Sequence, residues 1–276
     1  TFNADRIVVG ADDEQAYKII EKMYAPLKLP IVHVSVRSSE MTKYASNDFL
    51  ALKISYINEI ANFCEIVGAD IEEVARGMGM DRRIGSNFLK AGIGYGGSCF
   101  PKDTKALNFQ SDHAGVKLKT VKATIDVNRE QRTRLIDKAR RFFPTFRDVR
   151  VAIIGLTFKP GTDDLREAPA KQNIDILLNE GADIIAWDPL GAENFRKRYP
   201  NCAINFAKDI DEALTDADVC LIMTEWEKIV EYPLDNYKKY MKRPLVFDGR
   251  NCYKLSEAEK HEIFYDSIGR KIVDTL

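Results

Sequence analysis

The sequence predicts an α/β protein in three parts: a short α/β segment, a helical middle part and a C-terminal α/β domain. Strand-like runs alternate with helical runs at both ends of the chain, and this alternation is typical of parallel sheets with right-handed crossovers. The stretch between them shows helical spacing of its apolar residues and no strand pattern. We therefore expect three domains, at residues 1–36, 37–145 and 146–276.

The first part has the order strand, helix, strand. Residues 6–10 form a short apolar run, residues 14–25 show a helical pattern, and residues 31–36 alternate apolar and polar side chains. This order resembles the last portion of an α/β domain whose beginning is absent. We therefore expect the chain to be a fragment.

One long helix dominates the middle part. Residues 40–67 contain neither Pro nor Gly, and their apolar side chains recur at helical spacing. Ser38 or Ser39 is the expected N-cap, and Gly68 is the expected residue just past the end. Shorter helices are expected at residues 71–78 and 104–112, a glycine-rich loop at 85–103, and a long helical stretch at 116–143.

The C-terminal part alternates strands and helices. The run VRVAIIG at residues 149–155 is typical of a buried strand. Further strands are expected at residues 184–187, 219–223, 245–248 and 263–268, with helices at 170–180 and 210–215. The expected fold of this part is a parallel sheet covered by helices.

Composition argues against several classes of protein. The 276 residues include 41 Lys and Arg against 42 Asp and Glu, so no basic excess indicates a nucleic-acid or anionic-membrane partner. No apolar run approaches the roughly 20 residues of a membrane-spanning helix. The five cysteines are widely spaced and only three histidines are present, which argues against a zinc site and for free thiols. We expect a cytoplasmic protein without a metal.

The most informative stretch is AGIGYGGSCFPKD, residues 91–103. Its four glycines, at positions 92, 94, 96 and 97, are costly unless the backbone must approach another group closely. Backbone N–H groups of such a loop can bind phosphate or sugar oxygens. Cys99 follows at once, and a cation such as Lys102 or a helix N-terminus favours the reactive thiolate.

By composition alone, a surface turn with an incidental cysteine is an equal alternative for this loop. The other four cysteines lie in apolar or uncharged surroundings in the sequence, and for them we expect core packing. They are Cys64, Cys202, Cys220 and Cys252.

The cysteine loop and three other segments resemble one known family. GYGGSCFPKD is similar to the active-site signature of the UDP-glucose/GDP-mannose dehydrogenase family. EMTKYASNDFLALKISYINE (40–59) resembles the family's central helix, DRRIGSNFLK (81–90) the segment before the cysteine loop, and VAIIGLTFKPGTDDLRE (151–167) the start of its UDP-binding domain. The resemblance implies a Rossmann NAD-binding domain, of which residues 1–36 are a remnant, a central helical dimerisation domain and a C-terminal Rossmann-like UDP-binding domain.

The resemblance implies a four-electron oxidation. The C6 alcohol of UDP-glucose becomes the carboxylate of UDP-glucuronate, with two NAD, one water, and a cysteine thiohemiacetal and thioester as intermediates. Ser98 and Phe100 favour UDP-glucose, because related branches have His or Leu at these positions. Two alternatives stay open: a dehydrogenase of another nucleotide sugar such as GDP-mannose, and a non-catalytic nucleotide-sugar-binding dimerisation module.

The same resemblance assigns roles to individual residues. Cys99 is the expected nucleophile; Lys43 and Asn47, four apart on one helix face, would stabilise the oxyanion, and Asp103 would assist water or hold Lys43. The expected cofactor-binding residues are Cys99, Lys102 and Arg166. The expected substrate-binding residues are Arg83, which would reach the neighbouring subunit's substrate, and Phe88, Leu89, Lys90, Gly94, Tyr95, Gly96, Phe158, Lys159 and Arg250. Without the resemblance, a solvated surface is the default for the charged members.

The sequence departs from the family in one respect. No GxGxxG fingerprint of an NAD-binding domain is present, so we expect no turnover by this chain. We still expect the chain to dimerise and to bind UDP-sugar weakly. The homodimer is expected through the central helices, because two apolar stripes are too extensive for one small domain to bury. These stripes are the helical stretch 116–143 and Phe49, Ile57, Ile60, Phe63 and Cys64. An intramolecular bundle is the alternative.

Overall fold

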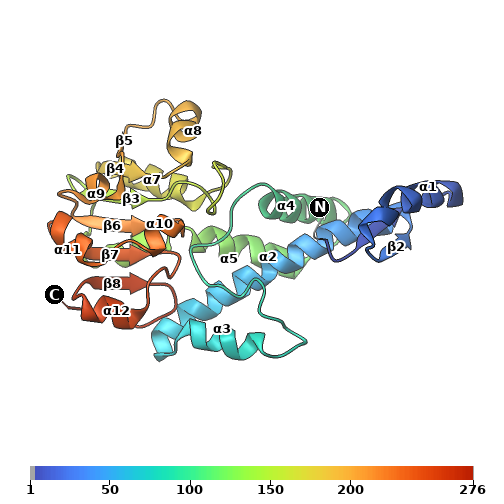
Figure 1. Ribbon diagram of the computed structural model, residues 1–276, viewed down its shortest axis with the longest axis horizontal. Coiled ribbons are helices and arrows are strands. Elements are labelled where there is room, and N and C mark those ends of the chain that lie inside the picture. The colour runs from blue at the N-terminus through green and yellow to red at the C-terminus, as the bar shows by residue number, and fades with distance from the viewer. Residues whose placement is uncertain (1–3, 276) are drawn as a thin grey trace. The chain divides into compact units, whose positions relative to one another are not determined.

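The computed structural model describes residues 4–275 of the chain (Figure 1). The chain forms two compact units, with the boundary between Leu50 and Ala51. Both units have the mixed helix and strand content of the expected α/β class. Within the described residues, no helix is both long and apolar enough to cross a bilayer.

The first unit contains the predicted strand, helix and strand. β1 (Ile7–Gly10) pairs with β2 (Ile31–Val34) in parallel, and α1 (Glu14–Tyr24) with a short 3-10 turn (Ala25–Leu27) connects them. The Asp13 side chain caps α1 by accepting the Gln15 N–H at 2.9 Å. This part of the prediction is confirmed.

The long helix α2 (Val36–Val67) begins earlier than predicted. The Ser35 hydroxyl oxygen accepts the N–H of Ser38 at 3.2 Å, so Ser35 is the N-cap, and the expectation of Ser38 or Ser39 is wrong. All three serines carry the capping hydroxyl, but the preceding strand ends at Val34 and leaves Ser35 at the junction. Gly68 follows the helix with a φ of 76°, as predicted.

The remaining central helices differ from the prediction at two points. After α3 (Ile71–Gly79), α4 (Cys99–His113) begins five residues before position 104 and so includes Cys99 itself. Pro101 does not prevent this, because the first turn of a helix needs no N–H acceptors. The stretch 116–143 is two helices, α5 (Lys119–Gln131) and α6 (Arg134–Ala139), since the Arg132 carbonyl between them accepts a hydrogen bond from Asn173 at 2.8 Å.

A six-stranded parallel sheet forms the C-terminal part. Its strand order is β5-β4-β3-β6-β7-β8. The strands are β3 (Arg150–Ile154), β4 (Asp183–Trp187), β5 (Asn205–Phe206), β6 (Val219–Ile222), β7 (Leu245–Asp248) and β8 (Phe264–Ser267). Because β3 is followed by β4 on one side and β6 lies on the other, the strand order reverses between β3 and β6, where α/β sheets bind ligands at the carboxyl edge.

Short helices connect the strands of this sheet. α7 and α9 were predicted, whereas α8, α10, α11, α12 and the two-residue β5 were not, because segments this short show no clear periodicity. The helices are α7 (Pro169–Asn179), α8 (Gly191–Arg198), α9 (Ile210–Leu214), α10 (Glu227–Val230), α11 (Asp235–Tyr240) and α12 (Leu255–Lys260).

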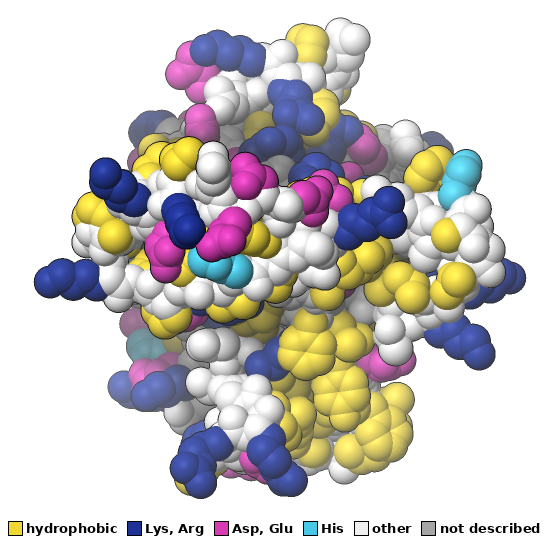
Figure 2. Space-filling model, turned by 90° about the vertical axis from the view of Figure 1, so that its right-hand side faces the viewer, with side chains coloured by type: hydrophobic (Ala, Val, Ile, Leu, Met, Phe, Trp, Pro, Cys, Tyr) yellow, Lys and Arg dark blue, Asp and Glu magenta, His cyan; other side chains and the backbone are white. Residues whose placement is uncertain are grey.

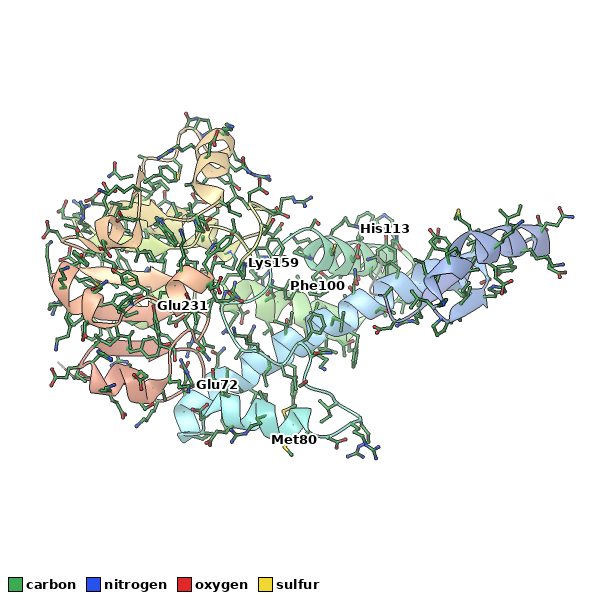
Figure 3. All side chains as sticks on the ribbon, in the orientation of Figure 1. Glu72, Met80, Phe100, His113, Lys159 and Glu231 are labelled. Carbon is green, nitrogen blue, oxygen red and sulfur yellow. The ribbon has the colours of Figure 1, made fainter. Side chains whose placement is uncertain are left out.

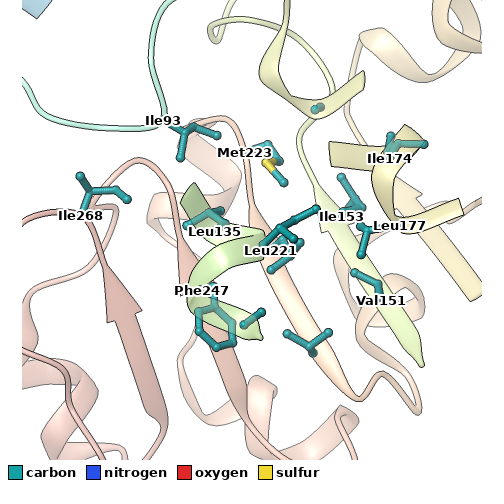
Figure 4. Packing of buried hydrophobic residues seen from close by; sticks show 14 of the residues in the cluster. Ile93, Leu135, Val151, Ile153, Ile174, Leu177, Leu221, Met223, Phe247 and Ile268 are labelled. Atoms are coloured by element: carbon teal, nitrogen blue, oxygen red, sulfur yellow. The ribbon is translucent and has the colours of Figure 1, made fainter. Parts of the chain in front are cut away.

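The hydrophobic core lies on both faces of the sheet. On one face Ile153, Leu221 and Phe247 pack with Leu135 of α6, as Figure 4 shows. On the other, the alternate residues of the same strands form a second cluster that includes Ile154, Ile222, Val246 and Tyr265. Burial of both faces explains why consecutive residues of these strands are apolar, as Ile153 and Ile154 are in β3.

The first core cluster also contains the C-terminal half of α2. Ile57 and Cys64, expected in an exposed stripe, are 0% and 3% exposed, because they pack with Ile71 of α3 and residues of α6. Ile60 is partly buried against the same cluster. The expectation that the chain cannot cover this stripe is therefore wrong for these three side chains, whereas Phe49 and Phe63 are exposed.

Candidate active site

Buried amide side chains hold the glycine-rich loop before Cys99. Asn58 of α2 accepts the Gly92 N–H at 2.8 Å, and Gln131 of α5 donates to the Gly92 carbonyl at 2.8 Å. Asn128 of α5 accepts the Tyr95 N–H at 2.8 Å and donates to the Tyr95 carbonyl at 3.2 Å. All three amides are buried. They fix the loop backbone, since leaving such groups unpaired is costly.

Close approach by other groups of the protein, both backbone and side chain, explains the glycines. A Cβ on Gly94 would lie 2.6 Å from Asn128 Oδ1, and one on Gly96 would lie 2.4 Å from the Glu167 carbonyl oxygen. Gly94 and Gly97 also have φ angles of 82° and 80°, which side chains disfavour. The expectation of a close approach is confirmed, and the approaching groups belong to the protein itself.

The expected use of the loop N–H groups is therefore only partly possible. The N–H groups of Gly92 and Tyr95 donate to amide side chains. Those of Ile93 and Gly97 donate to the carbonyls of Gly249 (3.0 Å) and Arg166 (2.7 Å). These four N–H groups bind protein oxygens, so they are not the donors that a phosphate would use.

Cys99 is the first residue of α4, and its thiol is exposed. The Ser98 hydroxyl lies 3.9 Å from the sulfur. The N-terminus of a helix carries partial positive charge and favours a nearby anion. Composition left Cys99 undecided between a turn residue and a nucleophile; exposure at a helix N-terminus is a setting in which a thiol can react.

The aromatic cavity has a volume of about 330 Å³ and lies beside the cysteine loop. Four aromatic side chains and three cationic side chains contribute to its wall. Its lining residues are Ile54, Phe88, Lys90, Ala91, Gly94, Tyr95, Gly96, Phe100, Phe158, Lys159, Glu225 and Arg250. Figure 3 labels two of them, Phe100 and Lys159, which come from α4 and from the turn after β3.

Eight of the ten expected substrate-binding residues line this one cavity, although they come from distant parts of the sequence. Leu89 does not, because its side chain is 4% exposed and packs in the hydrophobic core. Arg83 does not either: its side chain is 89% exposed and forms an ion pair with Asp81 at 2.6 Å. That hydrogen bond holds the pKa of Asp81 below its ordinary value.

Arg250 is held in a fixed position on the cavity wall. Its Nε donates to the Met223 carbonyl at 2.9 Å and its Nη1 donates to the Gly94 carbonyl at 3.0 Å. The guanidinium thus connects the end of β6 to the cysteine loop. Glu225, which the sequence did not single out, lies 3.4 Å from Nε through its Oε2.

A second cavity of about 320 Å³, here called the cationic cavity, is lined by other residues of the same loop. Its lining residues are Gly97, Ser98, Pro101, Lys102, Lys105, Arg166, Glu167 and Arg198. Lys102 and Arg166 were expected to bind the cofactor. Lys105 and Arg198 were missed, because Arg198 lies on α8 and no local pattern connects it to Cys99.

Ion pairs order the floor of the cationic cavity. Glu167 accepts hydrogen bonds from Lys105 at 2.8 Å and from Arg132 at 2.9 Å. Arg166 pairs with Asp164 at 2.8 Å, and this hydrogen bond holds the pKa of the Asp164 carboxyl below its usual range. The acids leave an excess of positive charge, which suits an anionic ligand.

Asp103 lies one helical turn after Cys99 on α4 and is 1% exposed. Its Oδ1 accepts a hydrogen bond from Lys102 at 2.6 Å. In the first unit, Lys43 and Asn47 lie one turn apart on α2 and therefore share a face. Their predicted roles, like that of Asp103, stay predictions.

Asp188 stands where a Rossmann domain holds the ribose-binding acid, just after the second strand of its sheet. Here its Oδ2 accepts the N–H groups of Leu156 (2.7 Å) and Trp226 (3.1 Å), and its Oδ1 accepts the Gly191 N–H at 2.6 Å. These hydrogen bonds use the carboxylate to stabilise the turn before Phe158. Among residues 4–275, no group of three His, Cys, Asp or Glu side chains could hold a metal.

A parallel sheet with a cavity at its switch point is typical of nucleotide-binding α/β proteins, and here an exposed thiol stands at a helix N-terminus beside it. The family models agree. The central domain of the UDP-glucose/GDP-mannose dehydrogenase family matches residues 37–130, and the family's UDP-binding domain matches residues 152–255. The chain belongs to this family.

Individual relatives agree with the family. The chain is 48% identical over 273 residues to UDP-glucose 6-dehydrogenase YwqF of Bacillus subtilis, covering 99% of this chain and 62% of the relative. TuaD of the same organism, also a UDP-glucose 6-dehydrogenase, is 42% identical, with 99% and 59% covered. The solved UDP-glucose dehydrogenase of Pyrobaculum islandicum superposes with a TM-score of 0.89 at 32% identity, covering 98% of this chain and 60% of that one. The chain thus spans about 60% of the length of these relatives.

Proposed function

We propose that this chain carries the nucleophile and the nucleotide-sugar site of an NAD-dependent UDP-glucose 6-dehydrogenase. The observation that carries the proposal is the position of Cys99. The exposed thiol begins α4, and its two neighbours in sequence line the two cavities: Phe100 lines the aromatic cavity and Ser98 lines the cationic cavity. A thiol at this position has room for a sugar on one side and an anionic cofactor on the other.

The aromatic cavity suits a UDP-sugar. Lys90 and Lys159 supply positive charge for a diphosphate, and their side chains are exposed. Phe88 and Phe158 supply apolar faces for the base or sugar ring. The relatives named above act on UDP-glucose, and the proposal extends that substrate to this chain.

Cys99 supplies the chemistry that an alcohol dehydrogenase alone lacks. The first oxidation turns the C6 alcohol into an aldehyde, which loses no second hydride until a nucleophile has added. The Cys99 thiolate adds to the C6 carbonyl carbon and gives a thiohemiacetal, whose oxidised form is a thioester. Water then cleaves the C–S bond, which releases the carboxylic acid and returns the thiol.

The cationic cavity fits the pyrophosphate of a dinucleotide. Lys102, Lys105, Arg166 and Arg198 would face that anion, with Lys102 and Arg166 as the residues expected from the family. NAD, when bound, takes up a hydride in each of the two oxidations. The excess of cations on this wall would orient it beside Cys99.

Three further residues would act around the reacting carbon. Lys43 and Asn47 would donate hydrogen bonds to the oxyanion, as their shared helix face allows. Asp103 would hold a lysine or activate the hydrolytic water. Its burial and its bond to Lys102 support the positioning of a cation.

A homodimer through α2 is part of the proposal. Tyr56, Phe63 and Ile66 are 47%, 59% and 79% exposed, and their spacing of seven and three residues puts them on one helix face. Figure 2 shows that exposed hydrophobic side chains gather in the lower half of the face turned to the viewer. Exposed apolar clusters of this kind mark interaction sites. Phe63→Asp should convert a dimer at micromolar concentration into a monomer in sedimentation equilibrium; a parent chain that sediments as a monomer contradicts the dimer.

Two measurements test the proposal. The UDP-sugar 6-aldehyde should form an adduct on Cys99, visible by mass spectrometry and absent in Cys99→Ser; the buried Cys220 serves as internal control. Calorimetry should show binding of UDP and UDP-glucose, and weaker binding of GDP and GDP-mannose. Tighter binding of the GDP compounds would mean that the substrate is a GDP-sugar such as GDP-mannose and not UDP-glucose. Binding without any adduct would favour a non-catalytic module.

A further inference from the structure

Glu225 is a cavity residue that the proposed chemistry does not use. It follows β6 at the carboxyl edge of the sheet, at the switch point of the strand order. Among the described residues, it is the one carboxylate that lines the aromatic cavity. Its side chain is 26% exposed. A carboxylate in a cavity that binds a diphosphate needs an explanation, because like charges repel.

The partner of Glu225 is Arg250. Oε2 of Glu225 lies 3.4 Å from Nε of Arg250, which already donates to a carbonyl, and this oxygen is buried without a hydrogen-bond partner among the described residues. The exposed part of the Glu225 side chain therefore lies on its other atoms. Nη2 of Arg250 is likewise buried without a partner in the described chain. The pair thus has hydrogen-bonding capacity that the protein does not fill.

The opposite charges of Glu225 and Arg250 cancel, so the pair favours a neutral ligand group over a charged one. A phosphate beside Arg250 would also face the Glu225 carboxylate and would be repelled by it. A hydroxyl donates to a carboxylate and accepts from a guanidinium, so it matches both members. Lys90 and Lys159 of the same cavity remain as the cations for the diphosphate.

We propose that the Glu225 carboxylate accepts a hydrogen bond from a sugar hydroxyl of the bound nucleotide sugar, and that the Glu225–Arg250 corner excludes the diphosphate. Glu225 is then a specificity-determining residue. The hydroxyl belongs either to the ribose or to the hexose, which have the same chemistry. This inference rests on the proposed function, because it takes a nucleotide sugar as the ligand.

Calorimetry of the full chain with UDP and with UDP-glucose tests the inference. Glu225→Ala removes the acceptor, and Glu225→Gln keeps its size while removing its charge, which guards against a variant that fails to fold. Glu227→Gln, an exposed glutamate two residues further on, is the matched control. We expect Glu225→Ala to weaken binding about 10- to 100-fold, Glu225→Gln to weaken it less, and the control to have no effect.

The pattern across the two ligands identifies the hydroxyl. Weaker binding of both ligands assigns the ribose, and weaker binding of UDP-glucose alone assigns the hexose. Tighter binding of both by Glu225→Ala would overturn the inference, because it would place a phosphate at this corner. Unchanged binding would overturn it as well, while leaving the proposed function intact. If the folded parent chain binds neither ligand, the proposed function itself fails.

Discussion

The aromatic and the cationic cavity share the cysteine loop as a wall, but the aromatic cavity has, besides the exposed Lys90 and Lys159, one cation that is held in place. Arg250 of the aromatic cavity is 12% exposed and bound to two backbone carbonyls. In the cationic cavity the side chains of Lys102, Lys105 and Arg166 are 68%, 57% and 54% exposed. A fixed, desolvated cation selects by geometry, whereas exposed cations attract anions through a field that salt screens. We therefore expect Arg250 to contribute to recognition and the exposed cations of the cationic cavity to contribute to attraction.

The largest effect is expected where the two walls meet. Gly96→Ala would place a Cβ 2.4 Å from the Glu167 carbonyl oxygen and 2.9 Å from Phe158, so the loop must shift. We expect a loss of about 2 kcal/mol in the free energy of unfolding, and loss of UDP binding. Gly77→Ala in α3 is the control, because its Cβ meets nothing within 4 Å and should stabilise by about 0.5–1 kcal/mol. Urea unfolding of both variants checks this; equal shifts would contradict the crowding argument.

A smaller effect is expected from the amide that fixes the aromatic side of the loop. Asn128→Ala leaves the buried Tyr95 N–H without its acceptor, while the Tyr95 carbonyl keeps Arg132 as a donor at 3.2 Å. The cost should be about 1–3 kcal/mol, with UDP binding several-fold weaker. Asn201→Ala, at an exposed position, should change neither quantity. Normal UDP affinity in Asn128→Ala would show that recognition does not depend on the loop conformation.

The cationic wall should respond to salt more than to any single side chain. We expect Arg166→Gln with Arg198→Gln to weaken binding of inorganic pyrophosphate a few-fold at low salt. At about 1 M salt the difference should vanish, because the screening length falls to about 3 Å. Calorimetry at the two salt concentrations measures this, with the exposed Lys260→Gln as control. A difference that persists at high salt would mean that these cations are fixed, as Arg250 is.

The smallest effect concerns pH and the ion pair behind this wall. The hydrogen bond from Arg166 lowers the pKa of Asp164 below its unfolded value of 3.8. Between the folded pKa and pH 3.8 the unfolded chain therefore binds more protons than the folded chain. The ion pair stabilises the fold fully above pH 3.8, and this contribution is lost as the pH falls through the lower folded pKa. Asp164→Asn should flatten the acid limb of the stability curve slightly. Asp163→Asn, which removes the charge of a carboxylate that accepts from Asn194 instead of Arg166, is the control, and an identical change in both would contradict the assignment.

Much of the fold could be predicted from the sequence because its signals are local. The buried strand residues 151–154, 184–187 and 219–222 are all apolar, and α2 lacks Pro and Gly over its whole length. Short elements such as α10 and β5 gave no signal, since four or two residues show no period. The start of α4 was misplaced because the glycine loop and Pro101 hid a helix that begins at Cys99.

The candidate site divides in the same way. Cys99, with its glycines and Lys102, stands in one continuous segment, so the sequence alone identified it together with its family. Glu225 and Arg198 were missed, because each comes from an element distant in sequence, and Lys105, on the same helix as Cys99, carries no local signal that distinguishes it from a surface lysine. Leu89 was assigned to the cavity by its neighbours Phe88 and Lys90, but its side chain is buried in the core.

The sequence by itself determined the class of fold, the family and the thiol, because each depends on short stretches of residues with a fixed local pattern. Only the tertiary structure decided what the glycines serve, which charges are paired, and which side chains share a cavity. The reversal of strand order between β3 and β6 brings turns that are more than 60 residues apart in sequence to one edge of the sheet. The 2.5 Å hydrogen bond from the Thr224 hydroxyl to the Thr157 carbonyl, which joins residues 67 positions apart, is an example. Distances of that kind are set by packing and not by neighbouring residues.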